Sequence, residues 1–171
     1  MAKKDKCDWE KLALRRAQFL LDEARSEEPT RDQTVTFALR VISNWATIGR
    51  DGSSSLVKWM NPNISQKAWD LYNRTDDVSW EKGCINEHQE PISHVWTWIL
   101  QNKDVISPAD ILVRAKKWPM VTVTKDEDNA ITEKGYRSNG DPEERHIMIA
   151  LGPKGPPKKR GRSAPSIKDE Q

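Results

Sequence analysis

Apolar residues recur at helical spacing over most of the chain, and short β-branched runs interrupt that spacing at a few places. Residues three and four apart lie on one face of a helix, so this pattern predicts amphipathic helices with one buried side. The segments predicted to be helical are 8–26, 31–48, 66–73, 92–102 and 108–118, followed by a shorter helix that begins after Thr124.

Capping residues mark several of these helix starts. Thr30 with Gln33, and Thr124 with Glu127, have the spacing of a capping box, in which two side chains satisfy the first free amides of a helix. Ser65 stands where a single side-chain cap is favoured. Glu127 is therefore assigned a capping role and not a catalytic one.

Three runs lack helical periodicity and are predicted to be strands. The runs are 84–88, 120–123 and 146–151. The expected fold is a mainly helical α+β protein with a small β-sheet. Its predicted regions are a helical N-terminal region over 1–82, a small α+β region over 83–152, and a disordered basic tail over 153–171 that has too few apolar residues to pack.

The charge of the chain is unevenly distributed. Residues 151–171 hold six of the 28 Lys and Arg and two of the 26 Asp and Glu, which leaves 22 basic against 24 acidic residues in the rest. The body therefore has no broad positive surface for nucleic acid, and any such contact must use a local patch or the tail. Two cysteines, with neither a signal peptide nor a long apolar run, predict a cytoplasmic protein without a membrane partner.

The stretch 84–91 is where the sequence offers a chemical constellation and not a packing pattern. Glu87 and His88 stand together at the end of a predicted strand, before Pro91. A carboxylate can hold a divalent cation, and a neutral imidazole can remove a proton from an attacking water. In the alternative interpretation, the pair ends a strand and forms ordinary hydrogen bonds.

Two further histidines bear on this stretch. His94 lies on the next predicted helix and His146 begins the third predicted strand, and the sequence leaves open whether either faces the same cleft. Cys84, His88 and His94 lack a fourth ligand and a paired cysteine, so no zinc is expected.

A strand ending in Glu-His, a second strand and a helix opened by acids resemble the HNH (ββα-metal) endonuclease family over residues 83–151. The resemblance implies Glu87 and Asp128 as ligands of Mg²⁺ or another divalent cation, with His88 as the general base. It implies a DNA-directed hydrolase of phage or bacterial defence, or a degenerate relative of one. The family's middle Asn and paired cysteines are missing from this sequence.

The tail segment from Pro157 to Arg162 resembles an AT-hook core. The resemblance implies that Arg160 and Arg162 enter a narrow minor groove of DNA while Lys158 and Lys159 contact phosphate. A solvated basic tail is the alternative. The competing function is a non-enzymatic accessory factor that binds DNA through the tail, or a protein partner through the N-terminal helices.

Overall fold

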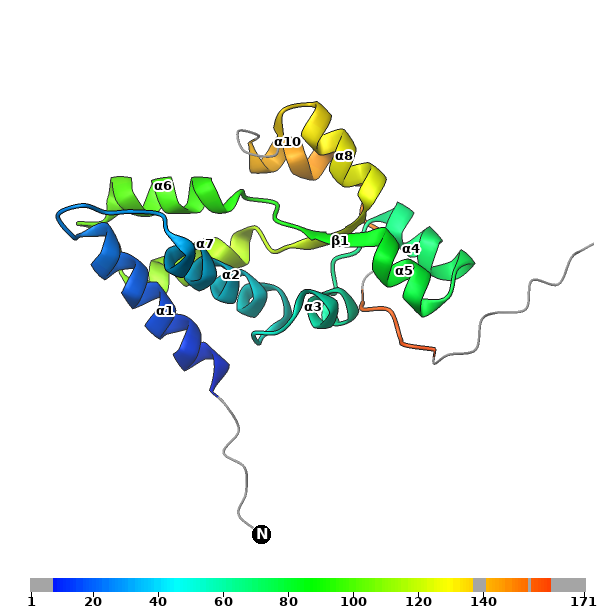
Figure 1. Ribbon diagram of the computed structural model, residues 1–171, viewed down its shortest axis with the longest axis horizontal. Coiled ribbons are helices and arrows are strands. Elements are labelled where there is room, and N and C mark those ends of the chain that lie inside the picture. The colour runs from blue at the N-terminus through cyan, green and yellow to red at the C-terminus, as the bar shows by residue number, and fades with distance from the viewer. Residues whose placement is uncertain (1–7, 137–140, 154, 161–171) are drawn as a thin grey trace, which may run out of the picture. The chain divides into compact units, whose positions relative to one another are not determined.

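The structure is a computed structural model that describes residues 8–136, 141–153 and 155–160. It is mainly helical with a two-stranded antiparallel sheet, so the predicted α+β class is confirmed (Figure 1). None of the helices described is both long and apolar enough to span a bilayer.

The chain forms two compact units, and each unit is assembled from two separate stretches of sequence. Unit 1 comprises the described parts of Met1–Gly52 and Glu90–Pro119, and unit 2 those of Ser53–Gln89 and Met120–Gln171. The predicted boundary between residues 82 and 83 therefore lies inside unit 2. Periodicity reports which residues are buried and not which distant segments share a core, so it could not place these boundaries.

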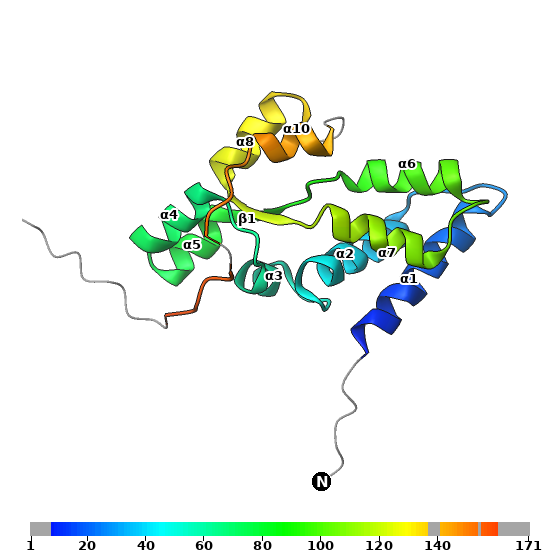
Figure 2. The ribbon, with the colours of Figure 1, turned by 180° about the vertical axis from the view of Figure 1, so that it is seen from behind.

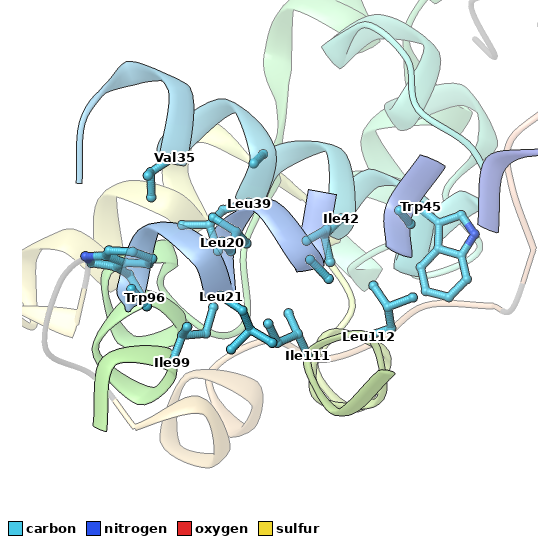
Figure 3. Close-up of a cluster of buried hydrophobic side chains, with 14 residues drawn as sticks. Leu20, Leu21, Val35, Leu39, Ile42, Trp45, Trp96, Ile99, Ile111 and Leu112 are labelled. Atoms are coloured by element: carbon cyan, nitrogen blue, oxygen red, sulfur yellow. The ribbon is translucent and has the colours of Figure 1, made fainter. Parts of the chain in front are cut away.

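Four helices build the core of unit 1. They are α1 (Trp9–Ala24), α2 (Gln33–Ile48), α6 (Ile92–Asn102) and α7 (Pro108–Lys117). Their apolar faces meet in one cluster, in which Leu20 from α1, Ile42 from α2 and Ile111 from α7 are at most 2% exposed (Figure 3). Leu20 and Ile42 are among the apolar positions whose spacing predicted the first two helices.

The start of α2 differs from the prediction. Asp32, and not Thr30, is the cap, because its carboxylate accepts a hydrogen bond from the backbone N–H of Val35 at 2.9 Å. An aspartate is among the strongest capping residues, and its negative charge also interacts favourably with the positive end of the helix dipole. The predicted capping box of Thr30 and Gln33 is therefore wrong.

Unit 2 surrounds the sheet with short helices. Its described elements are α3 (Ser54–Met60), α4 (Gln66–Arg74), α5 (Asp77–Gly83), β1 (Cys84–Glu87), β2 (Val121–Thr124), α8 (Lys125–Glu133) and α10 (Pro142–Ile147). The strands pair with Cys84 opposite Thr124 and Glu87 opposite Val121. Figures 1 and 2 show α8 and α10 side by side and α4 beside α5.

The predicted third strand, 146–151, is wrong. The chain turns at residues 148 and 149, and residues 146 and 147 belong to the helix α10. Pro142 occupies its first position and Asp141 accepts a hydrogen bond from the N–H of Glu143 at 2.7 Å, two features that favour a helix start. Leu151 does adopt extended pairing, but its bridge is to Ser65 and not to β1 or β2.

Candidate functional site

Glu87, the predicted metal ligand on β1, forms an ion pair with Arg145 of α10. Arg145 is 1% exposed, and it also donates a hydrogen bond to the backbone carbonyl of Tyr136. Burial lowers the pKa of the Arg145 guanidinium to about 10, which leaves it charged at neutral pH. Because a buried charge is costly unless it is paired, the carboxylate of Glu87 neutralises this arginine.

The two other predicted site residues stand near the ends of their elements. His88 follows β1 and is half-buried, and Asp128 lies in the first turn of α8 and is also half-buried. Within the residues described, no three His, Cys, Asp or Glu side chains are grouped so that they could hold a metal ion. Glu87, His88 and Asp128 are thus not assembled into a cation site, and no cation-dependent step follows from them.

The remaining histidines do not extend this constellation. His94 belongs to α6 of unit 1, whereas Cys84 and His88 belong to unit 2. The side chain of His146 lies outside what the structure describes.

Cys84 is a packing residue. It is 2% exposed and lies in a cluster with Trp80, Trp59 and Ile64. Burial raises the pKa of its thiol to about 12, so at neutral pH the thiol stays protonated and is a poor nucleophile or metal ligand.

The predicted capping box of Thr124 and Glu127 is confirmed. The carboxylate of Glu127 also accepts a hydrogen bond at 2.7 Å from the hydroxyl of Ser65, which itself caps α4. One carboxylate therefore joins the N-terminal ends of α4 and α8. Sequence spacing could not indicate this contact, because 62 residues separate the two partners.

A basic groove lies on unit 2 between α4 and the start of α8. Its volume is about 650 Å³, and its lining includes Lys67 and Arg74 of α4 and Lys125 of α8, with Asp126 as the acidic member. The three basic side chains are exposed, and among the described residues none of them forms a salt bridge. We call this surface the basic groove.

Lys58 of α3 is a further cation of unit 2, but it is not among the residues that line the basic groove. Burial lowers the pKa of its ammonium group, and the charge of Lys125 also lowers it, while Glu81 acts in the opposite direction. The ammonium group of Lys58 donates a hydrogen bond to the backbone carbonyl of Glu81 at 2.7 Å.

Part of the predicted disordered tail is packed on unit 2. Pro157 is buried, and the hydroxyl of Tyr72 donates a hydrogen bond to the carbonyl of Lys158 at 2.6 Å. Arg160 forms a salt bridge with Asp77 at 3.4 Å. The prediction that residues 153–171 do not pack thus fails for residues 155–160 (orange-red in Figures 1 and 2), because aromatic and acidic side chains of unit 2 bind this basic segment. Arg162 lies outside the described residues.

Unit 1 has an exposed aromatic side chain on its α2 surface. Phe37 is 51% exposed, and the guanidinium carbon of Arg16 lies 5.4 Å from the centre of its ring. Arg31 and Arg40 line the same shallow depression, whose volume is about 630 Å³. A protein partner for the N-terminal helices stays a prediction, and this surface is where it would be sought.

Comparisons with protein-family models, curated proteins and solved structures found no match to this chain. The HNH and AT-hook resemblances therefore rest on the residues of the chain itself.

Proposed function

We propose that this chain is a non-enzymatic DNA-binding protein whose contact with the sugar-phosphate backbone is the basic groove of unit 2. The observation that carries the proposal is the convergence of Lys67, Arg74 and Lys125 on one groove. Two of these residues come from α4, and the third follows about fifty positions later in the sequence.

The charge of the basic groove suits a polyanion. The described part of the chain supplies no salt-bridge partner for its three cations, so an incoming phosphate displaces water and counterions and not a protein carboxylate. Contacts of this kind position a duplex and do not specify its sequence.

The position of Glu87 favours a binding function over the nuclease hypothesis. A metal-dependent nuclease needs a carboxylate available to the cation, and Glu87 is paired with a buried arginine. The nuclease hypothesis remains testable with plasmid DNA and Mg²⁺ or Mn²⁺, where it requires nicking that is lost in His88→Ala.

The groove proposal is tested by replacing Lys67, Arg74 and Lys125 with glutamine, singly and together, and measuring duplex binding by fluorescence anisotropy over a salt series. Glutamine removes the charge and retains a good helix-forming residue. Each lost phosphate contact is expected to lower the slope of log K against log salt by about 0.9 and to weaken binding equally for all sequences.

The matched control is Lys11→Gln on α1, which removes an equal charge from an exposed position in unit 1. It measures the effect of net charge alone. If the affinity and salt slope of each single variant equal those of the Lys11→Gln control, the basic groove is ruled out as the contact surface.

A further inference from the structure

Four aromatic side chains on α3, α4 and α5 form a cluster, which we call the aromatic seat. Its members are Trp59, Trp69, Tyr72 and Trp80. The ring centres of Trp59 and Trp80 are 4.5 Å apart, and those of Tyr72 and Trp80 are 6.0 Å apart. Trp59 and Tyr72 are the members whose rings contact cations of the segment 155–160.

The segment that contacts the aromatic seat contains two prolines followed by three basic residues. Its sequence is Gly155-Pro156-Pro157-Lys158-Lys159-Arg160. The backbone N–H of Gly155 donates a hydrogen bond to the carbonyl of Pro62 at 3.2 Å. The ammonium group of Lys159 lies 5.2 Å from the centre of the Trp59 ring. The indole of Trp59 donates to the carboxylate of Glu81 and lowers its pKa, and the charge of Lys159 lowers that pKa further.

Arg160 makes the most specific contacts of the segment. Its guanidinium donates to the carbonyls of Tyr72 and Thr75 at the end of α4, and it lies 4.0 Å from the centre of the Tyr72 ring. Its backbone N–H donates to Asp77 at 2.8 Å, at the start of α5. An arginine at a helix C-terminus satisfies carbonyls that have no partner within the helix, and it interacts favourably with the dipole.

The guanidinium N–H groups of Arg160 that donate to unit 2 are the same groups that an AT-hook arginine would use to bind the minor groove of DNA. A guanidinium that donates to Tyr72 and Thr75 and pairs with Asp77 cannot lie in a minor groove at the same time. We infer that the aromatic seat recognises the proline-containing basic segment of its own chain and thereby withholds Arg160 from DNA, so that release of the segment adds minor-groove binding to the contact made by the basic groove. The DNA part of this inference rests on the proposed function.

The first test needs no DNA. In the full-length chain, Tyr72→Phe removes the hydroxyl that bonds to the carbonyl of Lys158 but keeps the ring and the net charge. Loss of one hydrogen bond is expected to raise the open fraction of the segment about twofold to tenfold. Trypsin cleavage after Lys158 and Lys159, followed by mass spectrometry, should accelerate by the same factor because cleavage follows the open population. Unchanged cleavage in both Tyr72→Phe and Asp77→Asn would overturn the seat as a binding site for the segment.

The second test measures affinity for an A/T-rich duplex, with a G/C duplex for comparison. If release exposes Arg160, the gain in A/T affinity equals the gain in open fraction, since binding is limited by the competent population. Asp77→Asn should behave like Tyr72→Phe, and Asp104→Asn, at an exposed position of unit 1, corrects for the loss of one negative charge. Circular dichroism verifies that each variant is folded.

The two proposals fail in different ways. Faster cleavage combined with wild-type affinity for the A/T duplex overturns the withholding of Arg160, and it leaves the basic groove intact. If no form of the protein binds DNA, the proposed function and the withholding of Arg160 both fail, while cleavage still decides whether the aromatic seat holds the segment.

Discussion

Cys84 is both titratable and buried, because its thiol lies among tryptophan side chains. Its folded-state pKa is raised from 9.0 to about 12 because burial disfavours the thiolate. An unfolded chain releases this proton above pH 9, whereas the folded chain retains it. The contribution of Cys84 to stability is therefore complete below pH 9 and is lost as the pH rises towards 12.

This difference predicts a pH-dependent stability that Cys84→Ala removes. Above pH 9, one retained proton should lower the unfolding free energy by about 1.4 kcal/mol per pH unit. Urea unfolding between pH 8 and 10.5, in a background that carries Cys7→Ala, measures the slope. Lysine and tyrosine residues titrate in the same range, so the quantity compared is the difference between the two proteins. Parallel pH profiles would show that the Cys84 thiol titrates alike in the folded and unfolded chains.

At the scale of single residues, sequence could predict roles that depend on neighbours along the chain. The capping role of Glu127 follows from its distance to Thr124 and is confirmed. The ion pair of Glu87 was not predictable, because its partner Arg145 is 58 residues away and directly precedes a run that was assigned to a strand. A carboxylate next to a histidine suggests chemistry from sequence, but only the surrounding fold determines whether the carboxylate is available.

At the scale of elements, the N-terminal end of α2 provides a direct comparison between two candidate caps. Asp32→Ala should destabilise the protein by about 1 kcal/mol, the usual cost of losing a capping side chain. Thr30→Ala should change stability much less, because the carboxylate of Asp32 is the group that accepts the cap hydrogen bond. Chemical denaturation of the two variants measures both effects, and a larger loss for Thr30→Ala would restore the predicted capping box.

The long helices could be predicted from the sequence, whereas the shortest ones could not. Helices α1 and α2 are 16 residues long, enough for several repeats of an apolar face to appear in the sequence. Helices α3 and α5 have seven residues each, too few for a clear period of apolar residues to appear in the sequence. Their stability comes from tertiary packing of single side chains such as Trp80, which is fully buried.

At the scale of the whole molecule, the two units are interleaved along the chain, so neither is a continuous segment. A fragment of residues 1–82 contains α1 and α2 but lacks α6 and α7, whose side chains complete the core of unit 1. That fragment should bind a hydrophobic dye and melt without a cooperative transition, as monitored by circular dichroism. Co-expression with residues 83–171 should restore a single folded species. Cooperative melting of the fragment alone would show that the predicted N-terminal region folds by itself.

The interleaved chain also sets an order in time during synthesis. Residues emerge from the ribosome from the N-terminus onward, and the apolar faces of α1 and α2 must wait for α7, which ends at Lys117. At about 5–20 residues per second, the stretch between Gly52 and Lys117 takes roughly 3–13 s to synthesise. For that interval the nascent chain presents Leu20 and Ile42 without their final neighbours, and this delay makes it a natural client for chaperones that hold apolar helices.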